Sequence, residues 1–194
     1  CASSSATARC ATKESKTQFR KEFFKTLLRD VIAALEEKDI HAPLDLAVSG
    51  LALDSRRVSA GTLFFALPGE KEDGGDFIAE AMARGAVCAV CEQPPEGERP
   101  YILVPDAHKA LALCAAVWYG TPAGKMTLVG VTGTNGKTTT TYLIKQLLEK
   151  TLCVKVGLIG TNQNLIGDKV VPTDRTTPDA LTVQRLLAQM ANAG

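Results

Sequence analysis

The chain has 194 residues, 45% of them hydrophobic, and its 22 lysines and arginines nearly balance 21 aspartates and glutamates. This length allows one large domain or two small ones, with a sizeable core. A near-neutral charge removes any electrostatic argument for nucleic acid or an acidic membrane surface as a partner. No apolar run reaches the roughly 20 residues that span a bilayer, so membrane insertion is not expected.

The cysteines are read as thiols rather than as metal ligands. Cys88 and Cys91 form a C-x-x-C pair, which could bind metal or carry redox chemistry, but they lie in or beside the run Ala86–Val90, which is typical of a buried strand. No second pair has zinc-ligand spacing, so small buried hydrophobes are favoured over a metal or redox pair. Free thiols and the lack of a signal-peptide pattern indicate a cytoplasmic protein.

The N-terminal segment, residues 1–42, combines a polar stretch with a helical pattern. Residues 1–16 are small and polar, and we expect disorder or an artefact of how the chain was delimited. A transit peptide is disfavoured by Glu14 and by the lack of an arginine-rich amphipathic pattern. From Phe23 to Leu35 apolar residues recur at helical spacing, which predicts an amphipathic helix packed on the next domain. A membrane-surface helix is disfavoured because its polar face is mixed rather than basic.

Residues 43–122 alternate between strand and helix patterns, which predicts an α/β domain whose ligand side lies at the strand ends. Asp76 and Asp106 are the expected N-caps of its two helices, and Gly85 ends the first. Taken alone, Asp54-Ser55-Arg56 favours a capped turn with a solvated arginine. Strands are expected at 48–53, 62–67, 86–90 and 101–104, and helices at 77–84 and between 106 and 120.

A glycine-rich stretch, Gly130–Thr140, follows the expected strand Met126–Val131 and precedes a helical pattern. Strand, glycine-rich loop and helix in this order are typical of a phosphate-binding loop, because glycines bring backbone N–H groups close to phosphate oxygens. Lys137 can place its charge on the outer phosphates, and the Thr138 hydroxyl suits Mg²⁺. Val131 stands where the general pattern has a glycine, but the whole pattern favours phosphate binding over a turn that binds nothing.

The remainder, up to residue 194, continues in α/β fashion. The helix after the loop is expected to bury Leu143, Ile144, Leu147 and Leu148. Next comes a strand at 153–159, expected inside a parallel sheet, and a hairpin at 164–171 with Gly167-Asp168 at its turn. A last helix would begin near Pro178 with Thr177 as its N-cap. Its expected apolar side consists of Val183, Leu186, Leu187 and Met190.

Several of these motifs together resemble the Mur ligases of peptidoglycan synthesis. The resemblance rests on Gly130–Thr141, Gly157–Thr161 and Thr176-Thr177-Pro178, preceded by Asp54-Ser55-Arg56 and Gly61–Phe64. It covers residues from about 45 to 194. Within the family the chain is most similar to the MurE branch, which adds the third amino acid to UDP-N-acetylmuramoyl-L-alanyl-D-glutamate.

The resemblance implies an α/β fold in two domains. Residues 43–122 would be the UDP-substrate-binding (uridine-binding) domain, and residues 123–194 the start of a P-loop, parallel-sheet ATP-binding domain that this chain does not complete. It also places Gly130, Gly133 and Gly136 where the family has its loop glycines. The glutamate Mg²⁺ ligand, modified lysine and C-terminal domain of the family would lie beyond residue 194, so the chain alone is expected to lack ligase activity.

The resemblance also implies roles for individual residues. The ATP loop would be Gly133, Thr134, Asn135, Gly136, Lys137, Thr138 and Thr139, with Lys137 the catalytic cation on the phosphates and Thr138 on Mg²⁺. Leu53 and Ser55 would lie at the uracil end of the substrate. Thr176 and Thr177, and more weakly Arg175, would contact the UDP-muramoyl-peptide.

The implied reaction is ATP-dependent amide formation through an acyl phosphate, with ATP and Mg²⁺ as cofactors. Its substrates would be UDP-N-acetylmuramoyl-dipeptide and an amino acid, diaminopimelate or lysine, and the full-length protein is expected to be monomeric. Two alternatives remain open within the pattern: a MurF-type dipeptide ligase, and a non-catalytic UDP-sugar-binding module. An unrelated P-loop ATPase would not explain Asp54-Ser55-Arg56.

Overall fold

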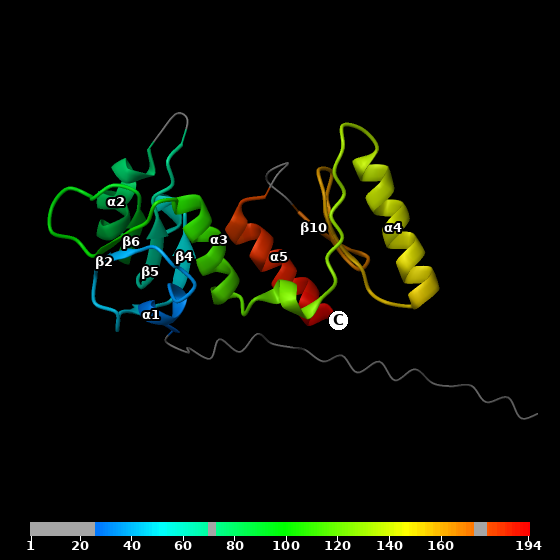
Figure 1. The fold of residues 1–194 in the computed structure, drawn as a ribbon, viewed down its shortest axis with the longest axis horizontal. Helices are drawn as coiled ribbons and strands as arrows, with labels where there is room; N and C mark the ends of the chain where they lie inside the picture. Colours follow the sequence, from blue (N-terminus) through cyan, green and yellow to red (C-terminus); the bar gives the residue numbers. More distant parts are fainter. Residues whose placement is uncertain (1–25, 70–72, 173–177) are drawn as a thin grey trace, which may run out of the picture.

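The computed structural model describes residues 26–69, 73–172 and 178–194 (Figure 1). Its larger sheet has five strands in the order β2-β7-β6-β5-β4. The last four of these pair in parallel, and β2 joins β7 antiparallel at one edge. The strands are β2 (Asp39–His41), β4 (Gly50–Ala52), β5 (Thr62–Phe65), β6 (Ala86–Cys91) and β7 (Tyr101–Leu103).

Helices cover both faces of this sheet. Successive side chains of a strand point to opposite faces, so β5 and β6 each contribute to two cores. Leu63, Phe65 and Val90 share one core with α1 (Leu28–Val31) and α3 (Ala107–Trp118). Phe64 and Ala89 share the other with α2 (Ile78–Ala83). The predicted α/β domain is therefore present, with its strands close to the predicted positions.

The expected strand at 48–53 is divided in two. A short strand β3 (Ala47–Val48) pairs antiparallel with β1 (Thr26–Leu27), and β4 follows after one residue. Ser49 between them donates its backbone N–H to Gly61, 2.8 Å away. Within the predicted strand the chain thus pairs first with β1 and then with β5.

The N-terminal helix is shorter than its pattern predicts. Among the described residues of this segment only Leu28–Val31 is α-helical. Thr26 and Leu27 before it form β1, and the backbone N–H of Leu28 bonds to the carbonyl of Leu46, 2.8 Å away. The predicted packing is nevertheless present, because Leu28, Val31, Ile32 and Leu35 are all buried in the core.

Helix ends in this domain follow local chemistry, with one exception. Asp106 accepts a hydrogen bond from the Lys109 N–H (2.8 Å) and caps α3, and Gly85 ends α2 with a positive φ of 104°, as predicted. Asp76 is not the cap of α2. A 3₁₀ turn, η2 (Gly74–Phe77), precedes that helix, and Asp73 caps the turn by accepting from the Gly75 N–H (2.9 Å).

A tight joint leads from α3 to the rest of the chain. Thr121 adopts a left-handed conformation with φ 47° and ψ 59°, between Gly120 and Pro122. Its N–H donates to the carbonyl of Ala116 (2.8 Å), which closes the end of α3. The 3₁₀ turn η3 (Pro122–Lys125) follows directly.

The second part of the chain contains two long helices and a small sheet. Helix α4 (Lys137–Leu152) is followed by β8 (Gly157–Ile159), β9 (Asn164–Ile166), β10 (Lys169–Val171) and α5 (Ala180–Ala193). The hairpin β9–β10 turns at Gly167, as predicted. Helix α5 packs against α3 and lies between α3 and the small sheet (Figure 1).

The predicted parallel sheet of this part does not form among the described residues. Residues 126–131 are not a strand, and Leu128 and Val129 are 57% and 61% exposed. Only 157–159 of the expected strand 153–159 is extended, and β8 pairs antiparallel with β9. A strand needs a hydrogen-bonded neighbour, and within the described ranges no segment pairs with residues 126–131.

Two details of the helices also differ from the predictions. Leu143 and Leu147 of α4 are 61% exposed, whereas Lys145 is buried, with its ammonium 2.6 Å from the Glu149 carboxylate. The sheet that would cover the leucines is missing from the described part of the chain. Helix α5 begins after Asp179, which caps it by accepting from the Thr182 N–H (2.8 Å), so Thr177 is not its N-cap.

Candidate nucleotide and substrate site

The glycine-rich loop has the shape of a loop that wraps an anion. Gly133 and Gly136 have φ of 140° and 79°, a region that side chains disfavour. Helix α4 begins at Lys137 directly after Gly136, so the first N–H groups of the helix face the loop. The Lys137 ammonium donates to the carbonyls of Gly133 (2.5 Å) and Thr134 (3.3 Å). Charge and backbone donors therefore converge on one loop, as the sequence predicts.

Part of this loop opens into a cavity shared with the small sheet. The cavity has a volume of about 260 Å³ and includes Lys137 and Thr138. The turn between β8 and β9, Gly160–Gln163, also lines the cavity, as does Pro178. Lys137 and Thr138 thus share one cavity with the turn between β8 and β9. Gly133, Thr134, Asn135, Gly136 and Thr139 do not line this cavity.

Two cavity residues hold its walls together. The Gln163 side-chain amide donates to the Tyr142 hydroxyl over 2.6 Å, which ties the β8–β9 turn to α4. Tyr142 lies four residues after Thr138 and so shares its side of the helix. Sequence reasoning missed both residues. The spacing of Thr138 and Tyr142 is the signal that could have indicated the tyrosine, but nothing local indicates Gln163.

The other predicted contacts belong to the five-stranded sheet. Asp54, Ser55 and Arg56 follow the carboxyl end of β4, where ligands of parallel sheets bind. Asp54 accepts from the Arg56 N–H (3.0 Å) and from its guanidinium Nε (2.9 Å), so it caps the 3₁₀ turn η1 (Ser55–Arg57). These bonds lower the pKa of Asp54, with the Arg56 side chain as the main cause. The capped turn expected from the motif alone is confirmed.

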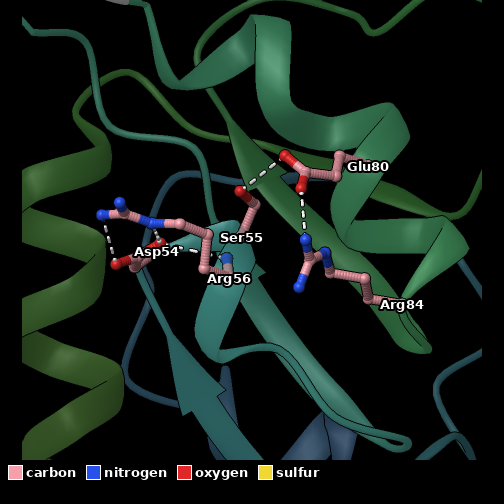
Figure 2. Close-up of polar contacts among 5 residues, drawn as sticks. All are labelled: Asp54, Ser55, Arg56, Glu80 and Arg84. Carbon is pink, nitrogen blue, oxygen red and sulfur yellow. Dashed lines mark hydrogen bonds and ion pairs between the residues drawn. The ribbon is translucent and has the colours of Figure 1, made fainter.

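Ser55 points away from that cap and towards α2 (Figure 2). It is buried, with 5% of its surface exposed, and its hydroxyl donates to Glu80 Oε2 over 2.8 Å. Glu80 Oε1 in turn forms an ion pair with Arg84 at 2.8 Å. The Ser55 hydrogen bond is the main cause that lowers the pKa of Glu80. Leu53, the other residue expected at the uracil end, is partly buried against the core of α1 and α3.

Three predicted substrate contacts, Arg175, Thr176 and Thr177, lie outside the described residues. The C-x-x-C pair is no metal site. Cys88 belongs to the core on one face of the sheet and Cys91 to the core on the other. In the described ranges no group of three or more histidines, cysteines or acids could hold a metal ion. Nor does any described helix have the length and apolar character to cross a membrane.

Two models of one protein family match the chain. The first, described as "Mur ligase family, catalytic domain", matches residues 47–119, and the second, "Mur ligase middle domain", matches residues 131–194. Together they cover more than two thirds of the sequence. The chain belongs to the Mur ligase family.

Two similar curated proteins share one name. UDP-N-acetylmuramoyl-L-alanyl-D-glutamate–2,6-diaminopimelate ligase of Parabacteroides distasonis is 45% identical over 86% of this chain and 35% of that protein. The enzyme of that name from Geobacillus kaustophilus is 48% identical over 76% of the chain and 30% of that protein. The chain therefore spans about a third of the length of the curated relatives it matches.

Solved Mur ligase structures agree with the fold. A structure of a ligase of the same name matches with a TM-score of 0.66 and 26% identity, over 88% of this chain and 34% of that one. MurF from Acinetobacter baumannii matches with a TM-score of 0.51 and 23% identity, over 83% and 31% of the two chains, which supports the fold only. The Mur ligase resemblance read from the loop, Asp54-Ser55-Arg56 and Thr176-Thr177-Pro178 is confirmed.

Proposed function

We propose that this chain carries the ATP phosphate loop and the uridine-nucleotide site of a ligase that joins diaminopimelate to UDP-N-acetylmuramoyl-L-alanyl-D-glutamate. One observation carries the proposal. Lys137 and Thr138, at the start of α4, share one cavity with the turn Gly160–Gln163 and with Pro178. The similarity to diaminopimelate ligases supports this choice of amino acid over lysine.

The proposed reaction needs charge compensation more than covalent chemistry by the protein. The substrate carboxylate attacks the γ-phosphorus of ATP, the bond to ADP breaks, and an acyl phosphate forms. The amine of the incoming amino acid then attacks the acyl carbon, loses its proton and displaces inorganic phosphate. Two anions must approach each other in the first step, and Lys137 would offset their repulsion from the loop.

The residues present fit a magnesium ion bound together with nucleotide. Mg²⁺ in nucleotide sites is held largely by phosphate oxygens and water, with few protein ligands, so one hydroxyl from Thr138 suffices on this side. When bound, the ion would neutralise phosphate charge. Leu53, Ser55, Arg175, Thr176 and Thr177 would hold the UDP-muramoyl-dipeptide. In this proposal the protein works in the cytoplasm, where both nucleotides are found, and as a monomer.

The loop is tested by binding of ADP with Mg²⁺ to the 194-residue chain, measured by calorimetry. Lys137→Ala should weaken binding at least about tenfold, because charge-assisted bonds to phosphate are among the stronger polar contacts. Lys150→Ala is the matched control, since Lys150 is an exposed lysine in the last turn of the same helix. Equal affinity of Lys137→Ala and the unchanged chain would refute the loop's role.

The branch of the family is tested with two muramoyl nucleotides. The chain should bind UDP-N-acetylmuramoyl-L-alanyl-D-glutamate more tightly than the same compound extended by diaminopimelate. Preference for the extended compound would instead favour a ligase that adds a dipeptide. If the chain binds ADP but neither muramoyl nucleotide, the phosphate loop stands and the uridine-nucleotide site is excluded.

A further inference from the structure

The hydroxyl of Ser55 donates its proton to the carboxylate of Glu80. An ionised carboxylate only accepts hydrogen bonds, and the Ser55 hydroxyl lies 2.8 Å from Glu80 Oε2. Arg84, 2.8 Å from the other oxygen, favours the ionised form of Glu80. The Ser55 proton must therefore point to Glu80, and only the lone pairs of its oxygen remain for another partner.

Contacts on both sides of Ser55 support this arrangement. Ser55 is 5% exposed, whereas the side chain of Glu80 is 41% exposed, so the bond between them lies at the edge of the packed turn. The turn η1 packs directly on α2, which carries Glu80 and is followed by Arg84. Asp54 meanwhile anchors the start of the same turn through the Arg56 backbone and side chain (Figure 2). The start of the turn is thus held by two sets of contacts, and the hydroxyl is oriented before any ligand arrives.

We propose that Glu80 is a positioning residue that keeps Ser55 a hydrogen-bond acceptor, so that the site selects a pyrimidine with an N–H donor at ring position 3. Uracil carries that donor, and it is the only N–H of the base when the ring is joined to ribose. Cytosine has a bare acceptor nitrogen at the same position and would face the Ser55 lone pairs. This inference rests on the proposed function, because it presumes that the base of the nucleotide lies at Ser55.

The test compares binding of UDP and CDP to the 194-residue chain by calorimetry. The unchanged chain should prefer UDP. Glu80→Gln keeps the shape of the side chain but offers an amide N–H to Ser55, which frees the hydroxyl to donate outward. The ratio of UDP to CDP affinity should therefore fall about tenfold, the size of one hydrogen bond that is made or left unpaired. A purely structural role of Glu80 would weaken both nucleotides equally and leave the ratio unchanged.

Two further variants separate the causes. Arg84→Gln removes the ion pair at Glu80 Oε1 but leaves the bond to Ser55, so the ratio should stay within about twofold of the unchanged chain. Ser55→Ala should lower the ratio as Glu80→Gln does, and adding Glu80→Gln to Ser55→Ala should lower it no further. Thermal unfolding of each variant checks the fold. If Glu80→Gln does not fold, Glu80→Ala takes its place, because it also removes the acceptor of the Ser55 proton and should lower the ratio; a preserved ratio there overturns the proposal.

The outcomes distinguish this inference from the proposed function. If the unchanged chain prefers UDP and Glu80→Gln keeps that preference, the role of Glu80 is refuted while the uridine site stands. If the unchanged chain binds neither UDP nor CDP, the uridine half of the proposed function fails, and the role of Glu80 fails with it.

Discussion

Cys88 and Cys91 lie on one strand at a separation of three residues, so their side chains point to opposite faces of the sheet. Each is buried in a different core. Burial raises the pKa of Cys88 to about 12 and that of Cys91 to about 11, and Cys114 in α3 is raised to about 12 in the same way. The thiols of these residues therefore stay protonated at neutral pH and react poorly.

We expect iodoacetamide at pH 8 to alkylate Cys153 quickly and to leave Cys88, Cys91 and Cys114 unmodified, because Cys153 is exposed and the other three are buried. Peptide mapping by mass spectrometry reads out each site. After denaturation in guanidinium all four should react, which serves as the control. Rapid alkylation of Cys88 in the folded chain would contradict the buried thiol.

The same pKa values determine whether alkaline pH raises or lowers the stability of the fold. The folded pKa of each buried thiol lies above the ordinary thiol pKa of 9.0. Folding therefore favours the protonated form, and this contribution is complete below about pH 9 and is lost as pH rises towards 12. Cys88→Ala would reduce the loss of stability at alkaline pH, and it would also remove some packing contacts of the Cys88 side chain.

At the scale of elements, the two long helices α3 and α4 differ in what covers their leucines. Leu111 of α3 is buried at 2% exposure, whereas Leu147 of α4 is 61% exposed. Truncating a buried leucine loses transfer free energy and leaves a cavity, but truncating an exposed one does neither. We expect Leu111→Ala to lower the free energy of unfolding by about 2–5 kcal/mol, and Leu147→Ala by less than about 1 kcal/mol.

Urea unfolding followed by circular dichroism measures both changes. Each variant changes a leucine to alanine within an α-helix, so helix propensity rises slightly in both and largely cancels from the comparison. A loss of 2 kcal/mol or more for Leu147→Ala would mean that α4 buries this face in solution.

These helices also show where sequence reasoning succeeds and fails. Asp106 and Gly85 act on N–H and carbonyl groups a few residues away, so the sequence alone predicted both helix ends. The apolar side of α4 was predicted from periodicity, but burial also needs a covering sheet, which periodicity does not contain. Residues 126–131 have a strand's composition, and no described segment pairs with them.

In the candidate site, too, local features could be predicted from the sequence and long-range contacts could not. The loop from Gly133 to Lys137 is continuous in the sequence, and its shape follows from its own glycines and the helix start. The contact of Ser55 with Glu80 joins residues 25 positions apart, and it exists only because η1 packs on α2. No spacing rule connects two such positions, so Glu80 could not be predicted from the sequence.

At the scale of the whole molecule, one residue sets how the chain passes from the five-stranded sheet to the phosphate loop. Thr121 is a β-branched residue in a left-handed conformation, with φ 47°, which costs free energy. We expect Thr121→Gly to change the free energy of unfolding by less than about 1 kcal/mol, because relief of strain offsets the larger entropy of glycine in the unfolded chain.

The same substitution should broaden the distribution of overall dimensions, which small-angle X-ray scattering measures. Gly124→Ala in the neighbouring turn is the control, since no atom lies within 4 Å of the added carbon. An unchanged scattering curve for Thr121→Gly would show that the packing of α5 on α3 alone holds the two parts together.

If the chain carries the two proposed nucleotide sites, the conformation of Thr121 has a consequence for their relative placement. A flexible tether would let the uridine site and the phosphate loop sample many separations, and each encounter would be a matter of chance. A threonine held in a rare backbone state, followed at once by a proline, works instead as a rigid elbow. The relative orientation of the two proposed sites would then be set in part by the backbone at this joint, before either nucleotide binds.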